Sequence, residues 1–297
     1  SSVLLRRVAQ REALRRTHHV FQTPRFLTVQ PPPNRQHFLS IRSFSSVPDL
    51  EENESEPQQG LRFEDLELHP KSLKAVRRHG LHNLTEIQEK TYDLVVSGKD
   101  VVGRARTGTG KTLSFLLPAL ERVVRQKELK PGIRILVMSP TRELAAQIAK
   151  DAERLTAQHG KEITSQVIYG GSSKREDVES FNRQLPTILV ATPGRLKDHL
   201  ASTSLRSGPF IDALQNLQTL VMDETDRLLD MGFRKDIQDI LSCLPKRRRQ
   251  TLLFSATLPK DVREVVELAI KSDYELVDCI QEEDPASHTN AQTEQSH

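Results

Sequence analysis

The sequence predicts an α/β fold in which a mostly parallel β-sheet is sandwiched by helices. Apolar runs of four to seven residues alternate along the chain with helical patterns of ten or more residues. Strands that are separated by helices join through right-handed crossovers, which produces a buried parallel sheet. A glycine-rich turn between the first such strand and the following helix has the pattern of a phosphate-binding loop.

Six segments have the composition of strands, and they lie at 99–105, 133–140, 165–171, 187–193, 217–224 and 250–257. Helical patterns fill the intervals between them. In the pattern over 142–159, Leu144, Ile148, Ala152 and Leu155 recur at spacings of four, four and three. These spacings place the four side chains on one face of a helix.

The first 46 residues differ in composition from the rest of the chain. Residues 1–50 contain eight Arg, no Lys and only two acidic residues, and a Ser cluster closes the segment. These features are typical of a disordered organellar transit peptide, and Arg42 before Ser43 resembles a mitochondrial processing site. We expect a mitochondrial (matrix) location, with chloroplast or nucleus as alternatives. A basic arm that binds RNA is a second interpretation of this segment.

Composition excludes several classes of protein. The chain is 36% hydrophobic and 28% charged, as soluble globular proteins are, and no run of 18 apolar residues could span a bilayer. Cys243 and Cys279 stand far apart without a CxxC or His cluster, which disfavours a disulfide framework or a zinc site. The net charge is +3 while residues 1–50 carry +6, so the remainder is not a generally basic nucleic-acid binder.

The segment ARTGTGKT, Ala105 to Thr112, has the phosphate-loop pattern with Ala at the usual place of the first Gly. Gly108 and Gly110 allow the backbone to curl so that N–H groups point at a phosphate. Lys111 would neutralise the outer phosphates, and the Thr112 hydroxyl would reach Mg²⁺. The alternative is a glycine-rich turn that happens to precede a helix.

The segment DETD, residues 223–226, follows an apolar run. Three carboxylates within four residues repel one another unless a cation lies among them. A nucleotide with Mg²⁺ supplies that cation: Asp223 would hold the ion through its water shell, and Glu224 would orient or deprotonate the attacking water. Taken alone, the segment could be an ordinary acidic helix start. Together with the phosphate loop, it predicts an NTPase.

Five motifs occur in the order ARTGTGKT, PTREL, TPGR, DETD followed by RLLDMGF, and SAT. In this order they resemble the first RecA-like domain of the DEAD-box ATP-dependent RNA helicases, from about Phe63 to about Asp278. Residues 47–60 are acidic and polar, which is the composition of a linker. The resemblance implies a Q-motif region at 61–89, a RecA-like, P-loop ATP-binding domain at 90–278 and a truncated interdomain linker at 279–297.

The resemblance also implies an ATP site in which Gln88 reads adenine and Phe63 stacks on it. The implied ATP-binding residues are Phe63, Gln88, Ala105, Arg106, Thr107, Gly108, Thr109, Gly110, Lys111 and Thr112. Lys111, Asp223 and Glu224 would be catalytic, and Thr112 and Asp223 would hold the Mg²⁺.

Further motifs imply an RNA site, whose residues are Pro140, Thr141, Arg142, Gly170, Gly171, Thr192, Pro193, Gly194 and Arg195. Each group follows a strand-like run, so we expect all of them at one edge of the sheet, contacting sugar and phosphate without sequence preference. Ser255, Ala256 and Thr257 would couple the ATP site to RNA separation through hydrogen bonds toward Asp226.

Two departures from the family pattern stand out. Thr225 occupies the third position of DETD, where the family has Ala, and no segment resembles the second RecA-like domain with its arginines. Arginine fingers contribute on the order of 10³ to 10⁵ in rate, so the chain alone is expected to hydrolyse ATP weakly or not at all. Because the chain also begins at Ser, we expect a fragment or an incomplete gene model. The alternatives are a truncated, non-catalytic ATP- or RNA-binding isoform and a DNA-directed or metabolic NTPase.

Overall fold

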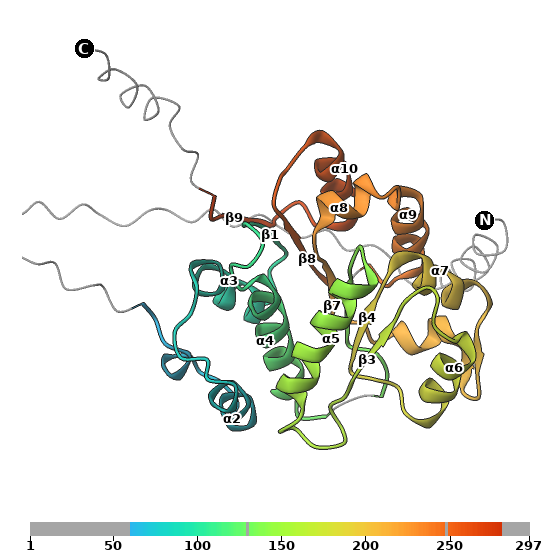
Figure 1. The fold of residues 1–297 in the computed structure, drawn as a ribbon, viewed down its shortest axis with the longest axis horizontal. Coiled ribbons are helices and arrows are strands. Elements are labelled where there is room, and N and C mark those ends of the chain that lie inside the picture. The colour runs from blue at the N-terminus through green and yellow to red at the C-terminus, as the bar shows by residue number, and fades with distance from the viewer. Residues whose placement is uncertain (1–59, 129–130, 247–248, 281–297) are drawn as a thin grey trace, which may run out of the picture. The chain divides into compact units, whose positions relative to one another are not determined.

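The computed structural model describes residues 60–128, 131–246 and 249–280. A sheet of seven parallel strands lies at the centre of this domain (Figure 1). The order across the sheet is β3-β4-β2-β7-β8-β1-β9, and every neighbouring pair is parallel. The strands are β1 (Val101–Arg104), β2 (Ile135–Met138), β3 (Ser165–Ile168), β4 (Ile188–Ala191), β7 (Thr219–Met222), β8 (Gln250–Ser255) and β9 (Glu275–Asp278). The predicted parallel sheet is therefore confirmed.

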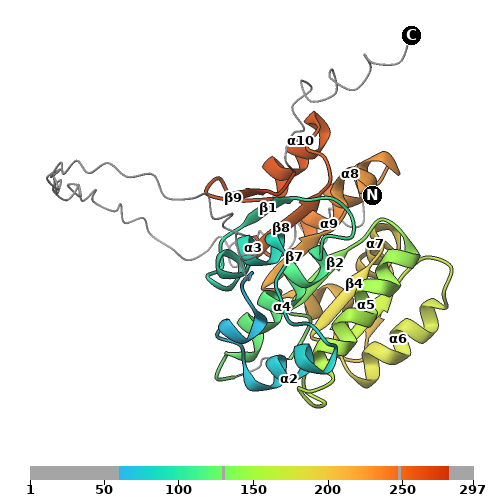
Figure 2. The same cartoon turned by 60° about the vertical axis from the view of Figure 1, so that its left-hand side comes forward.

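Helices cover both faces of this sheet. Those that contribute to the apolar cluster on one face are α2 (Pro70–Arg78), α3 (Glu86–Val96), α4 (Lys111–Val124) and α5 (Arg142–Thr156). The cluster on the other face contains α6 (Lys174–Arg183), α7 (Pro193–Ser202), α8 (Thr225–Asp230), α9 (Arg234–Cys243) and α10 (Lys260–Ala269). Both views show α4 and α5 on the same side of the strands (Figures 1 and 2).

The direction in which the chain crosses the sheet decides which face each helix covers. From β1 to β2 and from β2 to β3 the chain moves toward the β3 edge, and α4 and α5 lie on the first face. From β3 onward it moves toward the β9 edge, and the later helices lie on the second face. Because the chain reverses its direction across the sheet and its helices change face at the same point, all the crossovers have the same handedness, as the right-handed rule requires.

Side-chain alternation divides the core between the two faces. On β2, Ile135 and Val137 join the α4 and α5 face, whereas Leu136 and Met138 join the other. All four side chains are fully buried. A strand that is covered on both faces reads as a continuous apolar run, which is why these strands were recognisable from the sequence.

The structure contains elements that the sequence did not reveal. Edge strand β9 pairs with β1, and a short antiparallel hairpin joins β5 (Ser204–Leu205) to β6 (Gly208–Pro209). Short 3-10 helices, η1 (Phe63–Asp65) and η2 (Phe210–Leu214), complete the domain. The predicted transit peptide at 1–46, and the predicted linkers except residues 60, 279 and 280, lie outside the described residues.

Within the described ranges, no helix combines the length and the apolar character that crossing a bilayer requires.

Candidate functional site

The predicted motifs lie together at the carboxyl edge of the sheet. Each begins directly after a strand or one residue later: 105–112 after β1, 140–142 after β2, 170–171 after β3, 192–195 after β4, 223–226 after β7 and 256–257 after β8. Because all these strands are parallel, their carboxyl ends share one edge, as the sequence predicted.

The phosphate loop joins β1 to α4. Gly108 and Gly110 have φ angles of 81° and 89°, a region that strains residues with a Cβ. Lys111 is buried, and its Nζ donates to the carbonyl oxygen of Ala105 over 3.0 Å. The lysine thus folds back across a curled loop at the start of a helix, which is the arrangement that holds phosphate groups in proteins.

The rest of the loop is open to solvent or bonded locally. Arg106, Thr107 and Gly108 are exposed, and the Thr109 hydroxyl donates to the Arg106 carbonyl oxygen over 2.8 Å. The exposed backbone of this segment is the part that a phosphate would approach.

Gln88 connects α3 to the phosphate loop. Its Oε1 accepts from the Thr85 backbone N–H over 3.0 Å, which forms a capping box, and its Nε2 donates to the Gly110 carbonyl oxygen over 3.0 Å. A Cβ at Gly110 would lie 2.4 Å from that Nε2, so only glycine permits the approach. In this structure the amide positions the loop, and the reading of adenine stays a prediction.

Phe63 is a buried residue beside the Q-motif segment. The residue is 2% exposed and belongs to the apolar cluster on the α3 and α4 face. Its backbone N–H donates to the His82 carbonyl oxygen over 3.0 Å, which fixes η1 against the Q-motif segment. In this structure Phe63 packs in the core beside the Q-motif segment, and its stacking on adenine stays a prediction.

Asp223 is a buried carboxylate at the end of β7. Its Oδ1 is inaccessible to solvent and has no hydrogen-bond partner among the described residues. Burial raises the pKa of this carboxyl to about 6, and the neighbouring Lys111 ammonium opposes the rise. A buried carboxylate oxygen without a hydrogen bond costs free energy, so the position of Oδ1 is understandable if a cationic ligand binds there.

Glu224 has a strained backbone and an ion pair. Its φ of 47° is the only positive value at a non-glycine residue in the described part of the chain. Its Oε2 lies 2.7 Å from Nη1 of Arg227, whose side chain is largely exposed. Strain that persists at one carboxylate beside a predicted phosphate site supports a functional role for that carboxylate.

The contact predicted between DETD and SAT is present. Both the backbone N–H and the hydroxyl of Thr257 donate to Oδ2 of Asp226, over 3.0 and 2.9 Å, and the Asp226 N–H donates to Oγ of Ser255 over 3.2 Å. Although burial acts to raise it, hydrogen bonds from Thr257, Arg227 and Ser255 hold the pKa of Asp226 below its usual value. The Ser255 carbonyl oxygen also accepts from the Ala105 N–H over 3.1 Å. Ser255 therefore contacts both nucleotide-site loops.

The residues present suit Mg²⁺ bound together with a nucleotide. In the described ranges no cluster of three or more His, Cys, Asp or Glu could hold a metal alone. Mg²⁺ typically takes one or two carboxylates together with substrate phosphates and water. The unpartnered Oδ1 of Asp223 supplies the carboxylate oxygen, and Thr112 in the first turn of α4 supplies a hydroxyl.

Among the predicted RNA residues, Arg142 and Gly171 lie in contact. A Cβ at Gly171 would be 2.4 Å from Nη1 of Arg142, and the φ of Gly171 is +87°. The Arg142 side chain is exposed at the start of α5, where Thr141 caps the helix by accepting from the Leu144 N–H over 3.2 Å. The structure thus joins the PTREL and Gly-Gly motifs and leaves a cation exposed beside them.

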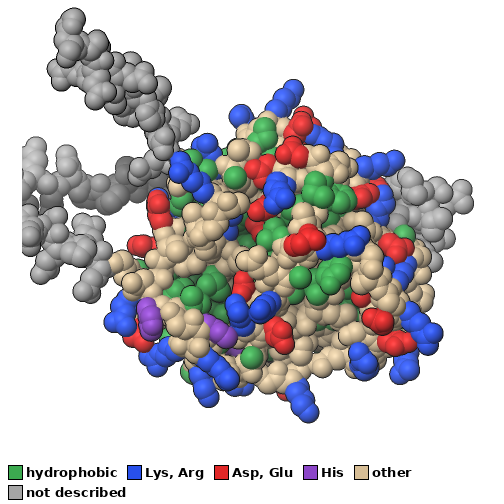
Figure 3. All heavy atoms as spheres, in the orientation of Figure 1, with side chains coloured by type: hydrophobic (Ala, Val, Ile, Leu, Met, Phe, Trp, Pro, Cys, Tyr) green, Lys and Arg blue, Asp and Glu red, His purple; other side chains and the backbone are tan. Residues whose placement is uncertain are grey.

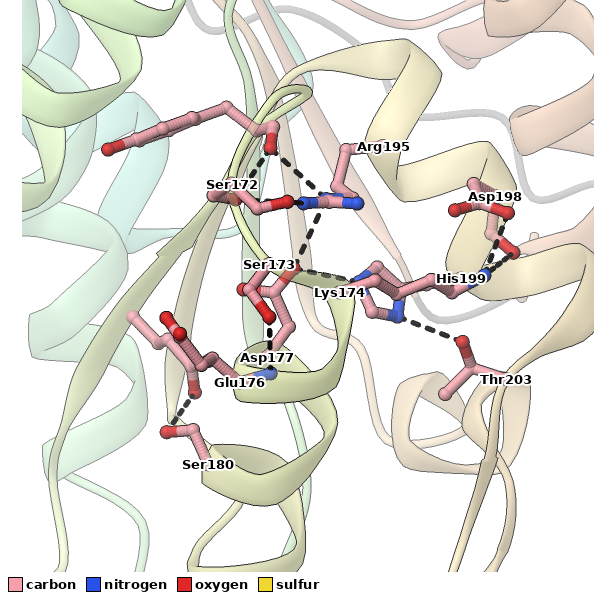
Figure 4. A network of polar contacts seen from close by, with 12 residues as sticks. Ser172, Ser173, Lys174, Glu176, Asp177, Ser180, Arg195, Asp198, His199 and Thr203 are labelled. Atoms are coloured by element: carbon pink, nitrogen blue, oxygen red, sulfur yellow. Dashed lines mark hydrogen bonds and ion pairs between the residues drawn. The ribbon is translucent and has the colours of Figure 1, made fainter.

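Arg195 does not point freely toward an RNA ligand. Its side chain is 9% exposed, and its Nε donates to the Tyr169 carbonyl oxygen over 3.1 Å and lies 3.2 Å from Oδ2 of Asp177 (Figure 4). Its Nη2 donates to Oγ of Ser172 over 2.8 Å and to the Ser172 carbonyl oxygen. In this structure the side chain therefore fastens the TPGR segment to the loop after β3, and its direct contact with RNA stays a prediction.

Several residues that shape the site were not found from the sequence. Oδ2 of Asp177, on α6, also lies within hydrogen-bond distance of Nε2 of His199, at 3.1 Å (Figure 4). The other ring nitrogen of His199 lies 3.0 Å from Oγ1 of Thr203. Arg227 could have been suspected, because it lies one helical turn after Glu224. Asp177 had no such signal, since its partners lie on another helix.

Comparison with known proteins gives a consistent result. A family model for the DEAD/DEAH box helicase matches residues 85–265. The chain is 44% identical over 232 residues to DEAD-box ATP-dependent RNA helicase 25 of Oryza sativa subsp. japonica. The matched segment covers 76% of this chain and 38% of that protein. The chain is also 44% identical over 241 residues to DEAD-box ATP-dependent RNA helicase 31 of Arabidopsis thaliana, covering 80% and 32%. The chain therefore spans less than half the length of these relatives.

A solved structure agrees with the sequence relatives. The crystal structure of a DEAD box protein from the hyperthermophile Methanococcus jannaschii has a TM-score of 0.63 at 33% identity, covering 74% of this chain and 56% of that one. With its motifs at one sheet edge and a family model that matches more than half of its length, the chain belongs to the DEAD/DEAH box helicase family.

Proposed function

We propose that this chain is the ATP-binding part of an ATP-dependent RNA helicase. The observation that carries the proposal is the meeting of a curled phosphate loop, a buried lysine and a buried carboxylate with one unbonded oxygen at one sheet edge. Lys111 would bind the outer phosphates of ATP, and Asp223 with Thr112 would hold Mg²⁺. The ion would neutralise charge on the phosphates during transfer.

Glu224 is proposed to act on the attacking water. Its carboxylate is mostly buried and already held in place by Arg227, so little ordering remains to be done when ATP binds. A second RecA-like domain would supply arginines to the transferred phosphate, and we propose that this chain alone turns ATP over slowly or not at all.

RNA is proposed to bind through its sugar-phosphate backbone, without sequence preference, along the loops after β2, β3 and β4. Two helices, α5 and α7, begin there, and their first N–H groups suit phosphate oxygens. Arg142 is the exposed cation of this region. Elsewhere basic and acidic side chains alternate on the visible face (Figure 3), so attraction would come from placed groups and not from bulk charge.

ATP binding and turnover, with and without poly(U), test the proposal. We expect the chain to bind MgATP, Lys111→Ala to abolish binding, and Lys90→Ala, an exposed lysine of α3 paired with Glu86, to leave it unchanged. RNA-stimulated turnover that Glu224→Gln lowers by about 10²-fold or more would show that this part assembles a working site by itself. Binding without turnover would support the non-catalytic alternative for the isolated chain. Failure of the unaltered chain to bind nucleotide would contradict the proposal.

The Arg-rich, acid-poor composition of residues 1–46 supports a proposed mitochondrial address. A fusion of residues 1–60 to a fluorescent protein should enter mitochondria, and replacing its Arg residues by Gln should prevent entry. Chloroplast or nuclear fluorescence would favour the alternative locations instead.

A further inference from the structure

Ser139 and Asp223 occupy matching positions at the carboxyl ends of two neighbouring strands. The last paired residues of β2 and β7 are Met138 and Met222, and the ladder continues with a hydrogen bond of 3.0 Å from the Asp223 N–H to the Met138 carbonyl oxygen. The next residues along the two strands are Ser139 and Asp223. They are therefore cross-strand neighbours, in strands that run about 4.8 Å apart.

Both side chains point to the face of the sheet that α4 and α5 cover. Val137 and Val221 lie in the apolar cluster of the α4 face, whereas Met138 and Met222 lie in the opposite cluster. Because side chains alternate along a strand, Ser139 and Asp223 point to the same face as the two valines. That face carries the N-terminus of α4, where Lys111 and Thr112 are placed.

Each side chain has a buried polar atom without a hydrogen-bond partner in the protein. Ser139 is fully buried, and its Oγ has no hydrogen-bond partner; the same holds for Oδ1 of Asp223. Only a few buried side-chain atoms in the described residues share this property. A buried polar atom without a partner destabilises the folded state, so two such atoms on cross-strand neighbours at a predicted ligand site suggest a common cause.

We propose that the Ser139 hydroxyl is a positioning residue for magnesium-bound nucleotide. Together with Oδ1 of Asp223 it would hydrogen-bond to the water shell of the ion. This inference rests on the proposed function and adds a residue to the same site. Mg²⁺ keeps several of its waters when it binds to proteins, and these waters need acceptors that the site must provide. Ser139 and Asp223 are two such acceptors on one face.

The proposal predicts opposite effects on stability and on binding. In Ser139→Ala the unsatisfied hydroxyl is removed, so the nucleotide-free chain should unfold at a higher temperature. The same variant should bind the ATP analogue AMP-PNP in Mg²⁺ about tenfold more weakly, as expected for a lost hydrogen bond to a charged group, and within twofold of the unaltered chain in EDTA. Ser139→Cys keeps the size but donates and accepts poorly, so it should also weaken binding in Mg²⁺.

Ser72→Ala is the matched control. Ser72 is equally buried, but its Oγ lies 3.1 Å from Nε2 of His159, far from the carboxyl edge. Its loss should lower the unfolding temperature and leave AMP-PNP binding unchanged. Binding of Ser139→Ala within twofold of the unaltered chain in Mg²⁺, or an unfolding temperature that falls as in Ser72→Ala, would overturn the inference alone. Absence of AMP-PNP binding by the unaltered chain would instead overturn the proposed function, and this inference with it.

Discussion

At the scale of single residues, Thr225 shows how a departure from the family pattern is accommodated. Its side chain is fully buried, and its hydroxyl lies 3.2 Å from the Met222 carbonyl oxygen and 3.4 Å from that of Phe254. It therefore joins the ends of β7 and β8. We expect Thr225→Ala to reduce the free energy of unfolding by about 1 to 2 kcal/mol, for one hydrogen bond and a small cavity, in urea titrations. Nucleotide binding should persist, because the hydroxyl faces backbone and no ligand; its loss would contradict this account.

His159 predicts a pH dependence of stability. Burial, aided by the nearby His69 ring and Lys71, lowers the pKa of His159 to about 4. Since the unfolded value is near 6.5, the folded chain binds fewer protons between these values, and stability falls as the pH is lowered through this window. The loss from this group should reach about 2 kcal/mol between pH 7 and pH 5. His159→Gln should show a smaller loss than the unaltered chain in urea titrations at the two pH values; an equal loss would argue against the assignment.

The residues that were predictable from sequence are those whose chemistry depends on neighbours in the chain. The phosphate loop is a continuous segment, and so its curl and its lysine followed from the order of residues alone. The surroundings of Phe63 and Arg195 could not be predicted, for the opposite reason. Whether an aromatic ring lies in the core or an arginine meets a carboxylate such as Asp177 depends on contacts between distant segments.

At the scale of elements, the network of Figure 4 joins α6 to α7. Asp177 faces both the Arg195 guanidinium and the His199 ring, and all three side chains are largely buried. Removing one partner leaves buried charge unpaired, so Asp177→Ala should reduce the free energy of unfolding by about 3 kcal/mol. Because Arg195 then loses its anchor, RNA affinity should also fall. Glu179→Ala is the control, since its pair with Arg175 on the same helix is exposed and should contribute under about 0.5 kcal/mol. Equal effects of the two variants would contradict the assigned role.

Strand prediction succeeded for the five inner strands and for edge strand β3, and it failed for edge strand β9 and for the two-residue strands. The six predicted segments contain β1, β2, β3, β4, β7 and β8. Strand β9 was missed because it alternates, with Val277 buried and Leu276 exposed between charged residues, and so it lacks a continuous apolar run. The two-residue strands β5 and β6 are too short for any periodicity to be detected.

At the scale of the whole molecule, the balance of charge determines how RNA binding should respond to salt. If a few placed groups contact phosphates, the logarithm of the binding constant should fall with log salt at about −0.7 per phosphate. Arg142→Ala removes about one phosphate contact, so it should make this slope shallower by about 0.7. The slope is measured by fluorescence anisotropy on single-stranded RNA. Arg154→Ala is the control. Arg154 lies on the same helix, where it pairs with Asp151, and its loss should leave the slope unchanged. An unchanged slope in Arg142→Ala would place the RNA elsewhere.

Ser255 connects the phosphate loop to the acidic segment. Strand β8 separates β7, which carries the carboxylates, from β1, which carries the phosphate loop. One serine at its end holds the first residue of the loop through its carbonyl oxygen and Asp226 through its hydroxyl. A displacement of this strand end would therefore disturb hydrogen bonds to both loops, which makes Ser255 a physical link between the phosphate loop and the acidic segment.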